Sequence, residues 1–146
     1  MSLIHTCYRI TDIDRSVAFY EALGFKEAGR LPIERDDTSA AGKARQDGEP
    51  APKRVEAVNV FMNQPEDGEN PRLELTYNVG RTAPYDIGTG YGHIAITADD
   101  LDGTLAALAE QGIEPERPPY TVSEGGSRLC FVRDPDGYRI EILERS

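Results

Sequence analysis

The feature that most constrains the fold is an internal repeat. Moving the chain along itself by 88 positions superposes its only two histidines, His5 and His93, and aligns acidic, apolar and glycine positions without a gap. The aligned pairs are Asp12 with Asp100, Ile13 with Leu101, Asp14 with Asp102, Val17 with Leu105, Tyr20 with Leu108, Gly24 with Gly112 and Phe25 with Ile113. Such a match predicts two copies of one structural unit.

A second match lies near the end of each copy. Residues 72–75 (Arg-Leu-Glu-Leu) match residues 139–142 (Arg-Ile-Glu-Ile) at an offset of 67, so each copy has one early His and one late Glu, Glu74 or Glu141. The first copy is therefore 21 residues longer, the length of segment 34–54, which carries ten charges and no aliphatic side chain larger than Ala. Such a segment buries too little surface to offset its ordering entropy, so we expect a mobile surface insertion, with a structured lid as the alternative.

Periodicity predicts the same helices and strands in both copies. A short first strand leads into a helix that follows an N-capping Asp, Asp12 or Asp100, and ends at Gly24 or Gly112. Three strands are expected afterwards in each copy, at 26–33, 55–62 and 72–77, and at 114–122, 128–133 and 138–143, with a turn at 134–137. The predicted fold class is α+β, with tandem βαβββ modules in one domain: module 1 (residues 1–80, with the insertion at 34–54) and module 2 (residues 90–146).

Strand alternation places the matched polar residue of each strand on the face opposite its apolar neighbours. Glu74 shares a strand face with Thr76 and Asn78, whereas Glu141 lies between Ile140 and Ile142. Taken singly, each Glu is typical of a solvated strand and each His of a structural hydrogen bond. Two His and two Glu at equivalent repeat positions instead favour a set of four donors around a pseudo-twofold axis, suited to Zn²⁺, Ni²⁺, Co²⁺, Fe²⁺ or Mn²⁺.

Composition excludes other classes of function. The 16 basic and 26 acidic residues give a net charge of −10, which disfavours binding to nucleic acid. The longest apolar run, 105–109, is far shorter than the roughly 18 residues of a membrane span, and the first residues do not resemble a secretory signal. We expect a cytoplasmic protein that does not enter a membrane, with Cys7 and Cys130 as buried thiols in strands.

Four segments resemble a known family in sequence and in order. They are Ile4-His5-Thr6 with Arg9, residues 73–78 (Leu-Glu-Leu-Thr-Tyr-Asn), residues 88–95 (Gly-Thr-Gly-Tyr-Gly-His-Ile-Ala) and residues 134–141 (Asp-Pro-Asp-Gly-Tyr-Arg-Ile-Glu). Together they resemble glyoxalase I, the lactoylglutathione lyases of the vicinal oxygen chelate superfamily. The resemblance implies the glyoxalase/bleomycin-resistance/dioxygenase fold, in which curved mixed sheets have their helices on the outside.

The resemblance also implies a site and a reaction. His5, Glu74, His93 and Glu141 would bind one divalent metal per site. Members of the family divide between Zn²⁺ and Ni²⁺ or Co²⁺, and for this chain our own expectation slightly favours Ni²⁺ or Co²⁺ over Zn²⁺. The sites would be shared in a homodimer, with His5 and Glu74 from one subunit and His93 and Glu141 from the other. The hemithioacetal of methylglyoxal and glutathione, the cosubstrate, would be isomerised to S-lactoylglutathione through a metal-bound enediolate, with Glu141 as principal base and Glu74 as its counterpart.

Three further residues are expected to bind substrate. Arg9 and Asn78 match positions that bind the glutathione moiety in the family. Relatives often carry a lysine in the glycine-rich loop before the 134–137 turn. In this chain the loop is residues 122–128, and it contains no lysine. Arg128 is the candidate to replace it.

Two alternatives stay open. An epimerase or a thiol transferase of the same superfamily would use a similar metal site, whereas two His with two Glu disfavour an extradiol dioxygenase, whose iron has two His and one carboxylate. A metal-free dimer that binds small molecules would depend on aromatic walls, and this chain has no Trp and four Phe.

Overall fold

The computed structural model describes residues 1–37, 48 and 50–145. Its elements follow the order βαβββ twice, as the repeat predicts. Module 1 contains β1 (Thr6–Ile10), α1 (Ile13–Ala22), β2 (Lys26–Asp36), β3 (Lys53–Asn63), the short 3₁₀ helix η1 (Pro65–Asp67) and β4 (Leu73–Asn78). Module 2 contains β5 (His93–Ala98), α3 (Leu101–Glu110), β6 (Tyr120–Thr121), β7 (Arg128–Arg133) and β8 (Arg139–Glu144).

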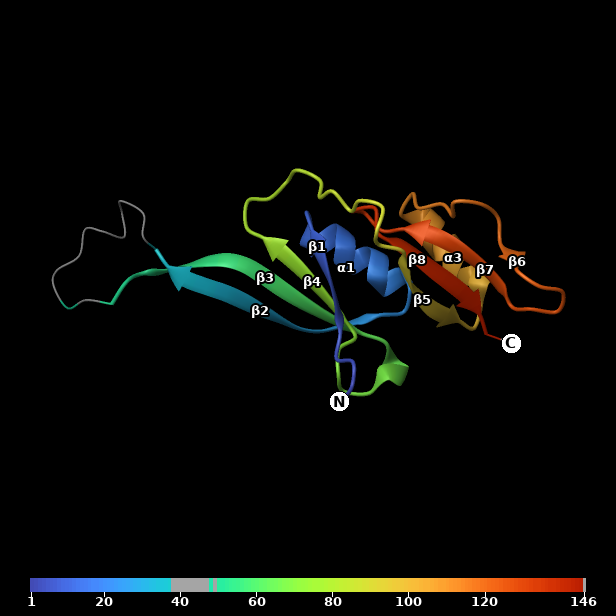
Figure 1. The fold of residues 1–146 in the computed structure, drawn as a ribbon, viewed down its shortest axis with the longest axis horizontal. Helices are drawn as coiled ribbons and strands as arrows, with labels where there is room; N and C mark the ends of the chain where they lie inside the picture. The colour runs from blue at the N-terminus through green and yellow to red at the C-terminus, as the bar shows by residue number, and fades with distance from the viewer. Residues whose placement is uncertain (38–47, 49, 146) are drawn as a thin grey trace.

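Each module forms one open, mixed, four-stranded sheet. The strand orders are β1-β4-β3-β2 and β5-β8-β7-β6, so they are equivalent in the two modules. The first strand of each module runs parallel to the last one and forms an edge of its sheet, and the other pairs are antiparallel. Figure 1 shows the sheets one after the other along the long axis. The predicted α+β class with two modules of mixed sheet is confirmed.

Both helices begin and end where the sequence predicts. The side chain of Asp12 accepts a 2.9 Å hydrogen bond from the backbone N of Arg15, and Asp100 accepts one of 2.8 Å from Gly103. These carboxylates satisfy backbone donors that lack a partner within the first turn. The chain leaves the helices through Gly24 (φ +87°) and Gly112 (φ +74°), in the left-handed region that favours glycine.

The core lies between each helix and one face of its sheet. In module 1 the buried strand residues include Tyr8, Leu75 and Val60, which alternate with residues on the opposite face. In module 2 Ile140 and Ile142 are fully buried in the same way. We call the opposite face of each sheet the site face, because alternation directs Glu74 and Glu141 toward it.

Aromatic rings and one turn join the two modules. Tyr8 of β1 stacks on Tyr138, with ring centroids 4.1 Å apart and planes 9° apart, and its hydroxyl forms a hydrogen bond with that of Tyr91. Asp136, in the predicted turn at 134–137, accepts hydrogen bonds from the backbone N (3.0 Å) and hydroxyl (2.6 Å) of Thr11. The turn therefore also docks module 2 onto the start of α1.

The expected insertion at 34–54 is partly strand, so that prediction is wrong at both ends. β2 extends to Asp36 and β3 begins at Lys53, and these two residues are paired. The hairpin projects from the body (Figure 1). Its outer part is stabilised by the ladder and by an ion pair of 2.7 Å between Arg35 and Glu56, so it forms without burial. Residues 38–47 and 49, which the expected mobile segment includes, lie outside the described residues.

The expected strand at 114–122 is also wrong, because only Tyr120 and Thr121 form a strand, β6. Pro115, Pro118 and Pro119 have no backbone N–H to donate to a ladder. The described residues include no helix that is both long and apolar enough to cross a membrane.

Candidate metal centre

The first pair of predicted donors meets at the start of β1. Nε2 of His5 lies 2.9 Å from Oε2 of Glu74, and the side chains are 33% and 14% exposed. Glu74 lies on β4, and the parallel pairing of β1 with β4 puts it beside Cys7, two residues after His5. The topology of module 1 thus brings together two donors that are far apart in the sequence.

The second pair repeats this geometry in module 2. Nε2 of His93 lies 2.9 Å from Oε2 of Glu141, and the side chains are 37% and 18% exposed. His93 begins β5, and the parallel partner of Glu141 on that strand is Ala95, again two residues after the His. The repeat therefore extends to the relative positions of individual side-chain atoms.

Two phenylalanines that sequence reasoning missed complete the equivalence. Phe61 is the antiparallel partner of Glu74, and Phe131 is the partner of Glu141. Each ring meets the neighbouring imidazole edge-on, at 6.2 Å from His5 and 5.1 Å from His93. The two Phe do not match at either repeat offset. The sequence showed only that an apolar strand precedes the strand that carries Glu74 or Glu141.

The other oxygen of Glu74 is also held. Its Oε1 accepts a 3.1 Å hydrogen bond from the Thr76 hydroxyl and lies 3.7 Å from the Cys7 thiol. Cys7 is exposed on the site face, so the expectation that it is buried is wrong, whereas Cys130 is buried as predicted. Cys7 alternates with the buried Tyr8, which takes the core side of this edge strand. Partial burial, and to a smaller extent the Glu74 carboxylate, raise the pKa of the Cys7 thiol.

Each pair has the spacing and chemistry of two neighbouring metal ligands. Imidazole and carboxylate donors bind borderline divalent ions at roughly 2.1 Å, and two such donors at right angles lie roughly 3 Å apart. Both His–Glu pairs show a separation of 2.9 Å. The residues present therefore fit a divalent metal, with two ligands from each pair.

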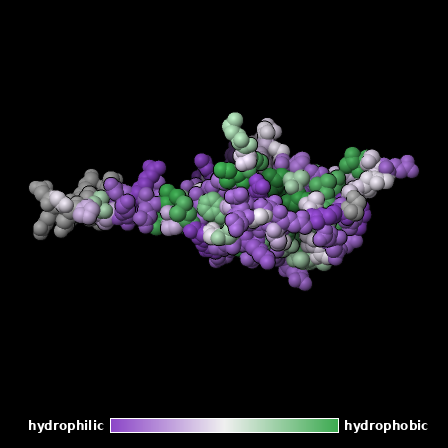
Figure 2. All heavy atoms as spheres, turned by 90° about the horizontal axis from the view of Figure 1, so that it is seen from below, coloured by the Kyte–Doolittle hydropathy of each residue, from purple (hydrophilic) through white to green (hydrophobic). Residues whose placement is uncertain are grey.

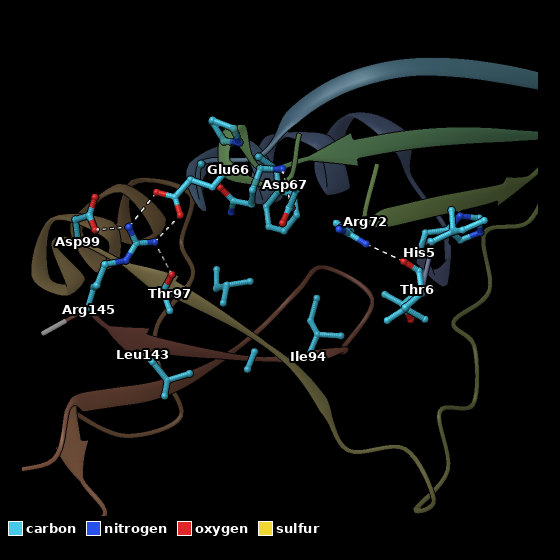
Figure 3. Close-up of a pocket in the computed structure, with 18 residues that line it drawn as sticks. His5, Thr6, Glu66, Asp67, Arg72, Ile94, Thr97, Asp99, Leu143 and Arg145 are labelled. Atoms are coloured by element: carbon cyan, nitrogen blue, oxygen red, sulfur yellow. Dashed lines mark hydrogen bonds and ion pairs between the residues drawn. The ribbon is translucent and has the colours of Figure 1, made fainter. Parts of the chain in front are cut away.

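The two pairs do not meet within one chain. Among the described residues, no three His, Cys, Asp or Glu side chains gather closely enough to hold a metal ion. A cavity of about 720 Å³ includes His5 in its lining, together with Phe25, Ile94, Ile96 and Leu143, but includes none of the other three donors. Arg145 bridges Glu66 and Asp99 at the opposite end from His5 (Figure 3).

The three predicted substrate-binding residues have different surroundings. Arg9 is exposed on the site face of β1, and Asn78 ends β4 on the same face, where it donates a 2.8 Å hydrogen bond to the hydroxyl of Tyr85. Arg128 lies on the helix-covered side of β7, where it pairs with Asp102 at 2.7 Å and Glu144 at 3.4 Å. The structure therefore brings Arg9 and Asn78 to the side of Glu74, and directs Arg128 away from Glu141.

Comparison with known proteins gives consistent matches. Residues 2–142 match the Glyoxalase/Bleomycin resistance protein/Dioxygenase superfamily model. The chain is 37% identical over 145 residues to lactoylglutathione lyase of Haemophilus influenzae, covering 99% of this chain and 93% of that protein. Lactoylglutathione lyase of Arabidopsis thaliana is 34% identical over 143 residues, or 97% of this chain and 44% of that one.

A solved structure has a similar fold. The crystal structure of glyoxalase I from Zea mays is 32% identical and superposes with a TM-score of 0.71, covering 99% of this chain and 44% of that one. The chain thus spans less than half the length of these plant relatives and nearly the whole length of the bacterial one.

Proposed function

The chain belongs to the Glyoxalase/Bleomycin resistance protein/Dioxygenase superfamily, and from this premise we propose that it is a metal-dependent glyoxalase I. In this proposal it isomerises the hemithioacetal of methylglyoxal and glutathione to S-lactoylglutathione. The observation that carries the proposal is the equality of the two donor pairs, His5 with Glu74 and His93 with Glu141, each 2.9 Å apart and each beside a Phe. Bacterial relatives of nearly equal length, one named lactoylglutathione lyase and one named probable lactoylglutathione lyase, support it.

A homodimer would complete the site. In this arrangement His5 and Glu74 of one subunit face His93 and Glu141 of the other, and each dimer has two sites. Support comes from the edge strands β1 and β5. His5 directly precedes β1 and His93 begins β5, and each of these strands has one unpaired side within its sheet. Exposed apolar residues lie beside these edges, including Leu3 (78%), Ile4 (61%) and Tyr91 (39%), and Figure 2 shows apolar patches along one rim of a largely hydrophilic surface. A second copy would cover them.

The metal would be held by the four donors, with Ni²⁺ or Co²⁺ proposed in preference to Zn²⁺. When bound, a divalent ion supplies Lewis-acid stabilisation to the vicinal oxygens of the substrate. The edge-on contacts of Phe61 and Phe131 would restrict rotation of the two imidazole rings, so that each Nε2 atom stays directed at its carboxylate. The site therefore needs little reorganisation to accept the ion.

The carboxylates would transfer the proton. Glu141 is the proposed principal base, which takes the proton from the carbon that bears the sulfur, and the proton is returned to the neighbouring carbon. Glu74 is its counterpart on the other side. Both carboxylates are mostly buried, at 18% and 14% side-chain exposure, which weakens competition from water for the proton.

Module 1 would bind the glutathione moiety. Arg9 offers an exposed guanidinium and Asn78 an amide on the face that carries Glu74. A γ-glutamyl end has a carboxylate beside an ammonium, which matches one cation together with a neutral donor and acceptor. The protein would act in the cytoplasm, where small thiols stay reduced, and its net charge of −10 disfavours a nucleic-acid partner.

Metal reconstitution tests the proposal. Protein stripped by a chelator is loaded separately with Ni²⁺, Co²⁺ or Zn²⁺, and formation of the thioester is followed by ultraviolet absorbance with glutathione and methylglyoxal. We expect no product from the stripped protein and the fastest reaction with Ni²⁺ or Co²⁺. Absence of product with all three metals would show that the proposed reaction is wrong.

A further inference from the structure

Building on the proposed function, we propose that Arg139, assisted by Arg133 and Arg117, receives the glycyl carboxylate of the thiol cosubstrate. These three residues are called the arginine cluster below. The cluster would take the role expected of Arg128, and it would lie across the completed site from Arg9. Its ligand class is a small thiol peptide that carries a bare carboxylate at the end opposite its amino-acid terminus.

Arg139 has the right position for this role. It is the strand partner of His93 and lies two residues before Glu141 on β8, so both side chains are on the site face. Two residues of a strand span roughly 6.6 Å, a distance that the glycyl arm of a thiol tripeptide can cover from the reacting carbon. The Arg139 guanidinium lies 4.0 Å from the centroid of the Phe131 ring, the same ring that contacts His93.

The charge of the arginine cluster as a whole is not balanced. Its guanidinium holds Glu116 with two hydrogen bonds, of 2.9 and 2.7 Å, and Arg133 binds the same carboxylate at 3.0 Å. These contacts, led by the hydrogen bond from Arg139, lower the pKa of Glu116, so this carboxylate is ionised. Arg139 and Arg133 share the Glu116 carboxylate, and Glu141, a proposed metal ligand, is the other carboxylate that acts on Arg139. With Arg117 included, the three cations of the cluster exceed these two acids by one positive charge.

A third cation, Arg117, follows Glu116 directly in the chain. The guanidinium carbon of Arg117 lies 3.2 Å from the ring centroid of Tyr120, and Arg117 makes no ion pair with any residue of the described chain. Tyr120 is the strand partner of Leu129 at the outer edge of the same sheet. The cluster thus extends across the site face from β8 to the strand that precedes the glycine-rich loop.

Arg128 shows the opposite balance. It is a single cation between two acids, Asp102 and Glu144, on the side of the sheet that α3 covers. A carboxylate of the substrate would meet a net negative charge there. The arginine cluster is therefore the cationic surface on the site face of module 2, and a guanidinium can bind a carboxylate with two parallel hydrogen bonds.

The charge of each end of glutathione decides which of the two surfaces it matches. The γ-glutamyl end of glutathione is a zwitterion, which suits Arg9 with the neutral Asn78. The glycyl end is a bare anion, which suits a surface with an unbalanced positive charge. With one module from each subunit at a site, the cosubstrate would span the two modules.

Binding of an unreactive analogue tests the inference. S-methylglutathione and its glycyl ethyl ester are titrated calorimetrically into the Ni²⁺-loaded protein, in the parent and in Arg139→Met, which keeps a stem over Phe131 but removes the charge. We expect the acid to bind about three- to ten-fold more weakly to Arg139→Met, the ester to bind equally to both proteins, and Arg139→Lys to recover part of the loss. Equal binding of acid and ester to the parent would overturn the inference, and this comparison requires no substitution.

Arg30→Met is the matched control. Arg30 also holds a carboxylate, that of Glu27, with two hydrogen bonds of 2.7 and 2.9 Å, but it lies on β2 of module 1. It should leave the affinity for both analogues unchanged, and an equal loss in Arg30→Met would overturn the inference by showing a general charge effect. Failure of the isomerisation assay together with selective loss in Arg139→Met would refute the proposed reaction but support the carboxylate site. If the parent catalyses the isomerisation but Arg139→Met binds the acid as tightly as the parent does, the proposed reaction is supported and the carboxylate site is refuted.

Discussion

The hydroxyl of Tyr20 donates a 2.9 Å hydrogen bond to Oδ2 of Asp134 in the interior of the protein, and this contact ties α1 of module 1 to the end of β7 in module 2. Asp134 is only 4% exposed, and its other oxygen accepts hydrogen bonds of 2.9 Å from the backbone N of Asp136 and of Tyr138. Burial raises the pKa of Asp134 to about 6, against the opposing effect of these hydrogen bonds. The junction of the modules therefore contains a carboxyl group that titrates in a mildly acidic range.

Replacing Asp134 with Asn should remove a pH dependence of stability. The pKa of this carboxyl is higher in the folded state than in the unfolded state, so its contribution is fully present below pH ~4 and is lost as the pH rises through about 6. Relative to Asp134→Asn, the parent should lose about 2–3 kcal/mol of unfolding free energy over that interval. Urea unfolding of both proteins from pH ~4 to pH ~7 measures the difference. A difference that does not change with pH would contradict the assignment.

Mixing two inactive variants should restore activity if the sites are shared. One variant lacks the module 1 donors (His5→Ala with Glu74→Gln) and the other lacks the module 2 donors (His93→Ala with Glu141→Gln). After subunit exchange, about a quarter of the parent activity should return, because half of the dimers are mixed and one of their two sites is complete. Each variant alone supplies the background rate. No recovery, with exchange verified by native mass spectrometry, would exclude sites shared in this way.

Glu141→Gln should lower kcat by about 10²- to 10⁴-fold, because it removes the proposed principal base but keeps an oxygen donor of the same shape. Glu74→Gln should lower kcat less at equal metal content. Metal analysis of each variant alongside steady-state kinetics separates loss of the base from loss of the ion. A larger effect at Glu74 than at Glu141 would reverse the assignment of the two carboxylates.

Phe61→Leu and Phe131→Leu should weaken metal binding to a similar degree. Each removes an edge-on contact that restricts an imidazole ring, at 6.2 Å from His5 or 5.1 Å from His93. Such contacts are worth about 0.5–1.5 kcal/mol, which corresponds to roughly a two- to ten-fold loss of affinity. Competition for the metal with a chromophoric chelator measures the affinity of each variant. Strongly unequal effects would show that the two donor pairs do not contribute alike, and Leu31→Ala, at an exposed position on β2, is the control.

Much of the fold could be read from the sequence, because the relevant signals are local and are repeated. The N-capping carboxylates Asp12 and Asp100 act on backbone groups within one turn, and apolar alternation selects the buried face of each strand. The same alternation placed Glu74 and Glu141 on the site faces. Prolines at 115, 118 and 119 argued against the strand expected at 114–122, because proline cannot donate to a strand ladder. The prediction considered only the apolar pattern.

By itself, the sequence determined that the chain contains two equivalent modules, each with one His and one Glu as potential metal donors, because a repeat preserves side-chain alternation and therefore the face on which each donor lies. Only the tertiary structure decided which residues meet across long separations. Strand order brought His5 to Glu74 and His93 to Glu141, turned Arg128 toward Asp102, and gathered Arg133 and Arg139 on Glu116. The physical reason is that an ion pair depends on the register and docking of whole strands, which no local periodicity encodes.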